Sequence, residues 1–164
     1  MKKIGLLSDT HGYWDDKYYH YFSECDEIWH AGDIGVNQVA EKLAAFKPFR
    51  AVYGNVDDHL LRTVYPQHLR FMCEEVDVWM THIGGYPGKY ASEVRPGIYE
   101  NPPALFICGH SHILKVTYDK SLKILCLNPG AAGKYGFHNV RTLLRFEIDK
   151  KEIRNLEVIE IVKK

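Results

Sequence analysis

Two histidines separated by one residue follow a short apolar run late in the chain. His110 and His112 lie in the segment CGHSH (108–112), directly after the apolar residues 104–107. Side chains at positions i and i+2 of an extended segment leave on the same face, so both imidazoles can approach a shared partner. A metal ion is the first candidate, because imidazole is a common metal ligand.

Other residues of metal-binding type follow earlier apolar runs. They are Asp9, His11, Asp33, Asn55 and His82. Asp9 and His11 repeat the i, i+2 spacing, and Asp33, behind the flexible Gly32, is the natural bridging carboxylate. Mixed nitrogen and oxygen ligands suit Mn, Ni, Fe or Zn better than Ca or Mg. Seven ligands are too many for one tetrahedral ion but fit two ions that share a bridge.

Such a pair of ions would carry out hydrolytic phosphate chemistry. Two cations about 3.5–4 Å apart can hold a hydroxide between them and clamp a phosphate. The hydroxide attacks phosphorus, so no covalent enzyme intermediate is required.

Each pattern alone also has an ordinary structural interpretation. Asp9 could cap a helix while His11 is solvated, and Gly-Asp or Gly-Asn is a common turn. A lone histidine at a strand end, such as His82, is more often structural than a ligand. The metal interpretation is favoured because five such clusters occur together, each at the end of a predicted strand.

The elements that must position these residues begin as an alternating series. Short apolar runs at 4–8, 27–31 and 49–53 are suited to buried strands. Aromatic residues in 13–25 are spaced like one face of a helix, and 36–46 forms a clear amphipathic helix before Pro48. This β-α-β-α-β order predicts an α/β fold.

The second half is rich in strands. We expect them within 69–82 (a pair joined near Glu74), 104–110, 115–119, 123–129, 142–149 and 152–161, with one helix within 87–97. The hairpin turns at 119–123 and 149–152 indicate a mostly antiparallel second sheet packed on the first. Ligand sites gather outside the carboxyl ends of strands in α/β sheets, which is where the candidate ligands lie.

Length and composition set the broad class. The 164 residues fit one domain, 1–164, and formal net charge is zero, which gives no attraction to nucleic acid or acidic membranes. The four cysteines form no C-x-x-C pair and are expected to be reduced. The N-terminus has too short an apolar run for a signal peptide, and no run reaches membrane-span length, so we expect a cytoplasmic protein.

The order of the five motifs SDTHG (8–12), GDIG (32–35), GNVD (54–57), THIGG (81–85) and CGHSH (108–112) resembles the calcineurin-like metallophosphoesterase superfamily. The small size and LNPGAAG (127–133) are similar to its compact YfcE-type phosphodiesterase branch. The resemblance implies two facing β-sheets in a sandwich flanked by helices, a four-layer fold.

The resemblance also implies roles for the candidate residues. It implies one ion on Asp9, His11 and His112, a second on Asn55, His82 and His110, and Asp33 between them. Asp33, Asn55 and His82 are the residues expected to act in catalysis.

The chain departs from the family pattern next to Asn55. Val56 stands where many members have a histidine that helps the leaving group, so substrates with poor leaving groups should react slowly. Asp57 matches an acidic position that orients Asn55.

Weaker candidates lie outside the motifs. His30 is either a support for the ligands or a buried strand histidine, and residues 128–130 form a turn close to the site. His138 and Arg141 either contact the phosphate or lie on the surface. Four aromatic residues either line a substrate cleft or pack structurally: Tyr13, Trp14, Tyr86 and Tyr90. Three further histidines are expected to be solvated: His20, His59 and His68.

The sequence therefore predicts a phosphodiesterase with two divalent ions, Mn²⁺ first, acting on a small phosphoester. Possible alternatives are a phosphomonoesterase or nucleotide phosphatase, and a non-catalytic scaffold like the retromer subunit that shares this fold. A nuclease is disfavoured by the neutral charge and small size. Membrane partners are not expected, and a homodimer or higher homo-oligomer is a further expectation.

Overall fold

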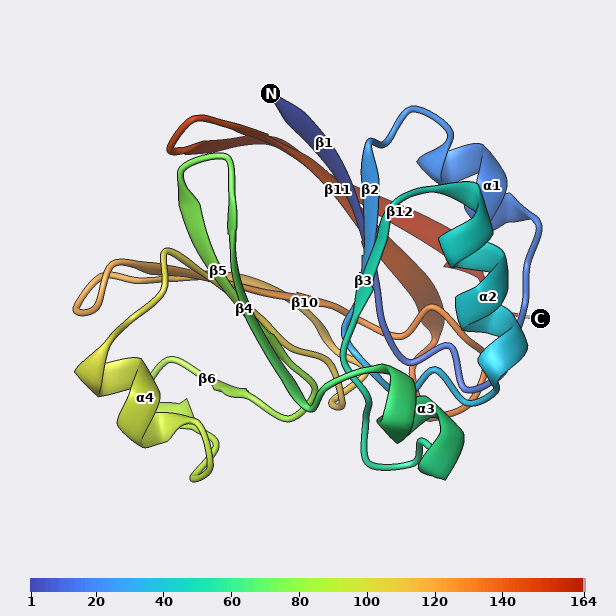
Figure 1. Ribbon diagram of the computed structural model, residues 1–164, viewed down its shortest axis with the longest axis horizontal. Coiled ribbons are helices and arrows are strands. Elements are labelled where there is room, and N and C mark those ends of the chain that lie inside the picture. The colour runs from blue at the N-terminus through green and yellow to red at the C-terminus, as the bar shows by residue number, and fades with distance from the viewer. Residues whose placement is uncertain (164) are drawn as a thin grey trace.

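Two five-stranded sheets form the body of the molecule, which is a computed structural model describing residues 1–163 (Figure 1). The first sheet has the spatial order β12 (Glu152–Val162), β11 (Val140–Asp149), β1 (Lys2–Leu7), β2 (Glu27–His30) and β3 (Phe49–Ala51). The second has the order β4 (His68–Cys73), β5 (Val76–Thr81), β8 (Leu105–Ile107), β10 (Ile124–Pro129) and β9 (Leu114–Asp119). A small hairpin pairs β6 (Gly85–Tyr86) with β7 (Lys89–Tyr90).

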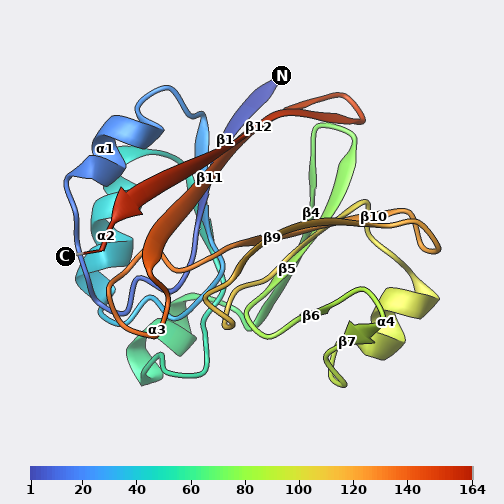
Figure 2. The same cartoon turned by 180° about the vertical axis from the view of Figure 1, so that it is seen from behind.

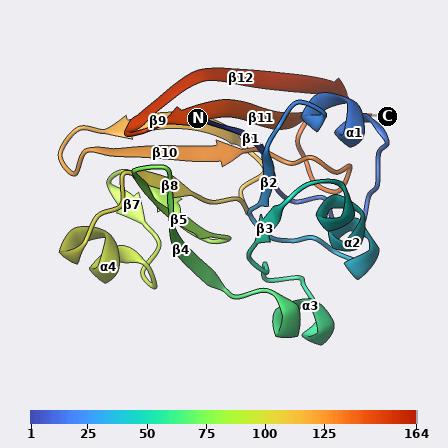
Figure 3. The same ribbon diagram turned by 45° about the horizontal axis from the view of Figure 1, so that its top comes forward.

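Helices cover the outer face of each sheet. α1 (Lys17–Phe22) and α2 (Asn37–Phe46) lie beside the first sheet, and α4 (Arg95–Glu100) lies beside the second (Figures 1 and 3). Tyr18 and Phe22 of α1 and Leu43 of α2 are buried in one cluster with residues of the first sheet. Ile98 of α4 packs in a separate cluster with Phe106 of the second sheet. α3 (His59–Val64) follows β3.

The main core lies between the sheets. Leu6 and Trp29 of the first sheet belong to one buried cluster with Met80 and Leu105 of the second. The indole of Trp29 meets the ring of Phe71 edge to face, with the ring centroids 5.0 Å apart. The arrangement of helices, sheet, sheet and helix confirms the predicted fold class.

The predicted organisation of the second half was wrong in two respects. β11 pairs with β1 and β12 pairs with β11, so both strands extend the first sheet rather than the second. The centre of the second sheet is parallel, because β8 pairs in parallel with both β5 and β10. The connection from β5 through α4 carries the chain back before β8 begins, and short apolar runs do not reveal strand direction.

Several helix boundaries also differ from the prediction. Only Lys17–Phe22 of the aromatic segment is helical, and the indole N–H of Trp14 instead donates to Asp16 in the preceding loop at 2.8 Å. The helix expected within 87–97 begins at Arg95, because β6 and β7 occupy residues 85–90. α3 was not predicted, although Asp58 caps it by accepting the backbone N–H of Leu61 at 3.1 Å. Within residues 1–163 no helix is long and apolar enough to cross a membrane.

Candidate metal centre

The candidate ligands lie in loops that follow the carboxyl ends of β1, β2, β3, β5 and β8. Backbone hydrogen bonds fix these loops against one another: the N–H of Asp9 donates to Gly32 at 2.9 Å, and the N–H of His11 donates to Asp33 at 3.0 Å. The N–H of Gly109 donates to the carbonyl of His82 at 2.9 Å, which joins the loops after β5 and β8 of the second sheet. The polar side chains therefore converge as the sequence predicted.

The backbone geometry differs from the extended form that the i, i+2 spacing implied. Five candidate ligands have left-handed backbone angles, with φ between 46° and 73°: Asp9, His11, Asp33, His110 and His112. Non-glycine residues in this region are strained by about 1–3 kcal/mol each, and such strain is typical of functional sites. Their side chains thus converge through tight loops and not through strand geometry.

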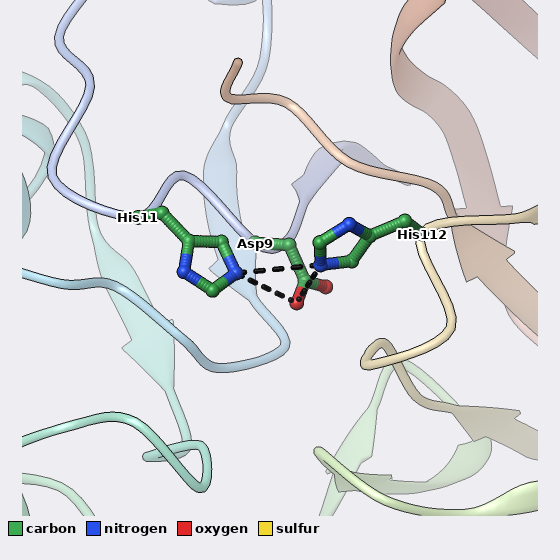
Figure 4. A group of neighbouring side chains, drawn as sticks. All are labelled: Asp9, His11 and His112. Carbon is green, nitrogen blue, oxygen red and sulfur yellow. Dashed lines mark hydrogen bonds and ion pairs between the residues drawn. The ribbon is translucent and has the colours of Figure 1, made fainter. Parts of the chain in front are cut away.

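Asp9, His11 and His112 form the first group of ligand atoms (Figure 4). Oδ1 of Asp9 lies 3.2 Å from Nε2 of His112 and 3.6 Å from Nε2 of His11. The two imidazole nitrogens lie 3.3 Å apart. These three atoms face one point, as ligands of a single cation would.

Asp33, His82 and His110 form the second group. Nε2 of His82 lies 3.0 Å from Oδ2 of Asp33. Oδ1 of Asn55 lies 3.0 Å from Nδ1 of His110, which adds the predicted amide to the same group.

The carboxylate of Asp33 lies between the groups. Its Oδ2 is 3.0 Å from Nε2 of His82 in the second group and 3.6 Å from Nε2 of His11 in the first. Its Oδ1 accepts the backbone N–H of Val56 at 3.0 Å, which fixes the orientation of the carboxylate.

Two buried atoms in the centre have no hydrogen-bond partner in the part of the chain that the structure describes. They are Oδ1 of Asp9 and Nε2 of His82. The other Asp9 oxygen accepts from Ser8 Oγ at 2.6 Å and from the N–H of His110 at 3.1 Å. Nδ1 of His82 donates to the carbonyl of Ala31 at 2.8 Å, which leaves the lone pair of Nε2 facing Asp33. Orphaned buried acceptors held in this way are the pattern that a cation satisfies, so the residues fit a metal site.

Electrostatics in the centre favour ionised carboxylates. Burial alone would raise the pKa of Asp9, but the adjacent imidazoles of His11 and His112 and the hydrogen bond from Ser8 hold it far below its usual value. Burial of Asp33 is likewise outweighed by His82, so its pKa is lowered. Burial would lower the pKa of His82, yet Asp33 and Asp9 raise it above its usual value. Anionic oxygens beside imidazoles are therefore available to cations near neutral pH.

Close packing allows only glycine at position 32. A Cβ there would lie 2.6 Å from Nδ1 of His82, and the residue has a left-handed φ of 102°. Gly32 thus lets the loop that carries Asp33 approach the imidazole of the second sheet.

Asp57 has a different role from the predicted one. Its carboxylate is buried and accepts the backbone N–H groups of Gly54 at 2.8 Å, Gly35 at 2.8 Å and Ile34 at 3.2 Å. It therefore joins the loops after β2 and β3, and does not bind the side chain of Asn55.

His30 is fully buried and supports the loops that carry the candidate ligands. Its Nδ1 accepts the N–H of Gly32 at 3.1 Å, so Nε2 carries the proton and donates to Thr10 Oγ1 at 3.0 Å. Burial lowers the pKa of His30 to about 3, so the ring is neutral.

The other weak candidates are also placed by their contacts. Arg141 is buried and donates to the carbonyl of Ala132 at 2.6 Å and to Asp15 at 2.9 Å, so it is structural and neither a phosphate contact nor a surface residue. His138 lies beside His112 with the ring centroids 5.4 Å apart, and its Nε2 donates to the carbonyl of Gly133 at 2.8 Å. Asn128 and Pro129 end β10 instead of forming the predicted turn, and the Asn128 side chain donates to the carbonyl of Gly109 at 3.0 Å. Three other histidines are exposed, as predicted: His20, His59 and His68.

Three surface hollows border the centre. One of about 300 Å³ is polar and is lined by Asn55, Arg62, His82 and Glu93, among others. A second of about 250 Å³ includes Ile83, Tyr86, His110 and Lys115. A third of about 620 Å³ is lined by His110, Ser111, His112, Ile113, Tyr135, Gly136, Phe137 and His138.

The lining of the hollows shows which of the four predicted aromatic residues lie beside the centre. Tyr86 lines the second hollow, whereas Tyr90 is buried against the second sheet and donates to Asp119 at 2.7 Å. Tyr13 and Trp14 line none of the three hollows. Ser8 and Tyr135 were not anticipated, because no spacing marks them.

The Asp, Asn and His side chains clustered at one edge of the two-sheet α/β sandwich are ligands of the kind that metal-dependent hydrolases use. The model of the calcineurin-like phosphoesterase superfamily domain matches residues 1–151, so the chain belongs to this superfamily. A probable metallophosphoesterase from Methanothermobacter thermautotrophicus is 28% identical over 135 residues, which cover 78% of this chain and 76% of the relative. The family and the two groups together indicate a phosphoester hydrolase that uses divalent metal.

Solved structures share the fold along nearly the whole chain. An archaeal phosphodiesterase is 22% identical, with a TM-score of 0.77 and coverage of 97% of this chain and 99% of that one. Wild-type Vps29 from Entamoeba histolytica, complexed with Zn²⁺, is 14% identical, with a TM-score of 0.75 and coverage of 99% of both chains. Small relatives of this shape agree with the predicted YfcE-type branch.

Proposed function

We propose that the protein is a phosphodiesterase that binds two divalent cations, one on each group, with Asp33 between them. The observation that carries the proposal is the position of Asp33 Oδ2, within 3.6 Å of an imidazole nitrogen from each group. Two such ions would supply a hydroxide nucleophile near neutral pH and neutralise charge on the phosphoryl oxygens.

The chain's own residues would hold and orient these parts. Asp9, His11 and His112 would hold one ion, and Asn55, His82 and His110 the other. The hydrogen bonds from Ser8 to Asp9 and from His82 to Ala31 fix the orientation of those side chains and so determine which of their atoms would bind the ions. Mn²⁺ is the proposed metal because the ligand set mixes imidazoles with carboxylates, and Ni²⁺, Fe²⁺ and Zn²⁺ accept the same set.

A diester is preferred over a monoester for two reasons. Hollows of different polarity lie on separate sides of the centre and could receive the two ester groups. Val56 offers no donor to a leaving group or to a dianionic phosphate, and its side chain is 50% exposed where the family histidine would stand.

The test is hydrolysis of bis(p-nitrophenyl) phosphate and p-nitrophenyl phosphate by metal-stripped protein, with and without Mn²⁺. We expect turnover only with metal, faster for the diester, and lost in Asp33→Ala. Asp26→Ala is the matched control, because Asp26 is an exposed carboxylate that accepts the N–H of Lys3 far from the centre. Equal turnover by Asp33→Ala and wild type would contradict the proposal.

A protein-binding scaffold is the second candidate, favoured by the fold that the chain shares with Vps29. The same hydrolysis assay distinguishes the scaffold from the phosphodiesterase. Two bound ions without turnover of diester or monoester, under any of the four metals, would favour the scaffold.

A further inference from the structure

A loop connects β10 to β11 (Figure 2). It passes beside the first group of ligands, because the ring of His138 lies against that of His112. At its start, the N–H of Gly133 donates to the carbonyl of Asp9 at 3.1 Å. His138 closes the loop by donating to the carbonyl of Gly133 at 2.8 Å. Lys163 holds the loop from behind through the carbonyls of Gly136 and His138, at 2.7 and 2.8 Å. Residues 133–138 are therefore a fixed loop whose side chains have defined positions.

Two aromatic side chains project from this loop. Tyr135 is 70% exposed, and its ring centroid lies 4.9 Å from that of His11. Phe137 is fully exposed, and Ile113, which follows the histidine pair, is 62% exposed. Large apolar side chains that a pinned loop holds in water next to a polar centre are a mark of a binding surface.

These residues enclose the hollow of about 620 Å³. His110 and His112 belong both to its lining and to the two ligand groups, so the hollow opens directly onto the centre. Its volume is in the usual range for a small-molecule site, roughly 300–1,000 Å³. None of its lining residues is a lysine, arginine, aspartate or glutamate.

The lining determines what kind of group could bind. A second phosphate or another charged group would find no ion partner there and would lose hydration. An aromatic ring would gain contacts with Tyr135 and Phe137 and remove apolar surface from water. The hollow beside Tyr86 is a weaker candidate, because the Lys115 ammonium already lies 4.0 Å over the Tyr86 ring.

We propose that this hollow is a subsite for an uncharged aromatic ester group, such as an aryl ring or a nucleobase, of a phosphodiester. This inference rests on the proposed function, since the phosphate would lie at the two ligand groups. The other ester group would face the polar hollow that contains Arg62 and Glu93. The favoured substrates are then unsymmetrical diesters with one aromatic and one polar substituent.

The test compares p-nitrophenyl phenyl phosphate with p-nitrophenyl methyl phosphate. In both, the p-nitrophenyl leaving group with its polar nitro substituent would face the polar hollow, so that only the second ester group, phenyl or methyl, would lie in the subsite. With Mn²⁺-loaded wild-type protein, kcat/KM should be about tenfold or more higher for the phenyl ester. Tyr135→Ala with Phe137→Ala should remove most of this preference, because kcat/KM for the phenyl ester should fall much more than kcat/KM for the methyl ester. Tyr118→Ala is the control, because Tyr118 is an exposed aromatic on β9 and lines none of the three hollows.

A binding measurement separates failure of the subsite from failure of the proposed function. Zn²⁺-loaded, ¹⁵N-labelled protein is titrated with phenylphosphonate and with methylphosphonate. Phenylphosphonate alone should shift the amide signals of residues 133–138, whether or not the protein turns over diesters. Equal kcat/KM for the two esters would overturn the proposal of an aromatic subsite. Equal shifts of the loop amide signals by the two phosphonates would also overturn it. No hydrolysis of any diester, with loop shifts by phenylphosphonate alone, would overturn only the proposed reaction.

Discussion

Nε2 of His82 lies 3.0 Å from Oδ2 of Asp33, while Nδ1 of the same ring donates to Ala31 at 2.8 Å. The space between the imidazole and the carboxylate can therefore hold either a proton or a cation. The raised pKa of His82 means that the metal-free protein keeps the proton to higher pH than an ordinary histidine does. Metal binding must displace it, so metal and protons compete at this pair.

The first prediction concerns stability with metal. Saturating Mn²⁺ should raise the melting temperature of EDTA-treated protein by about 5 °C or more, because ligands that bind only the folded state stabilise it. Differential scanning fluorimetry measures this. Asp9→Asn should reduce the shift, since it removes the anionic oxygen of the first group, whereas Asp26→Asn should keep it. An unchanged melting temperature in wild type would count against a metal site here.

The second prediction concerns acid stability. Burial lowers the pKa of His30 from 6.5 to about 3, so the unfolded chain binds this proton more readily between those values. The free energy of unfolding therefore falls as pH drops below 6.5, with a slope of up to about 1.4 kcal/mol per pH unit from this residue. Urea unfolding of wild type and His30→Gln at pH 7 and pH 5 measures the difference. If the free energy of unfolding fell as much from pH 7 to pH 5 in His30→Gln as in wild type, His30 would not be the cause of the pH dependence.

The third prediction concerns Arg141. Its guanidinium donates to Asp15, to the carbonyl of Ala132 and to the hydroxyl of Tyr18, on the face of the first sheet that α1 covers. Arg141→Ala should lower the free energy of unfolding by about 3 kcal/mol or more, because it leaves buried partners unpaired. Arg154→Ala, in the partly exposed ion-pair cluster with Glu147, should cost less than about 1 kcal/mol. A loss in Arg141→Ala no larger than in Arg154→Ala would restore the surface interpretation.

The fourth prediction concerns the missing family histidine. Val56 is half exposed and only its backbone N–H contacts Asp33, so Val56→His can add an imidazole without displacing the carboxylate. Hydrolysis of alkyl phosphodiesters, which have poor leaving groups, should rise by about tenfold or more, as expected of a proton donor. Hydrolysis of p-nitrophenyl esters should change little. Unchanged alkyl ester rates would show that another group already performs this role.

The candidate centre could be predicted from the sequence because its residues are of metal-ligand type and each follows directly after a predicted strand. Asp9, Asp33 and His82 each follow an apolar run, and the carboxyl ends of such runs meet at one edge of a sheet. The tight loops could not be predicted, because left-handed angles at residues such as His110 depend on packing that single sequences do not reveal.

Strand direction and supporting contacts were the least predictable features. β8 has only three residues, and its parallel pairing with β5 and β10 follows from the path of the intervening chain. Arg141 and Asp57 find their partners through contacts more than 20 residues apart, with Asp15 and Gly35 respectively. Spacing patterns report local geometry, whereas these contacts form only when distant segments of the first sheet come together.

Crystals of the protein grown with Mn²⁺ would test the central claim most directly, by anomalous scattering at the manganese edge. We predict two peaks about 3.5–4 Å apart on either side of Asp33 Oδ2, one near Asp9, His11 and His112 and the other near His82 and His110. A single peak, or two peaks that do not share Asp33, would contradict the account.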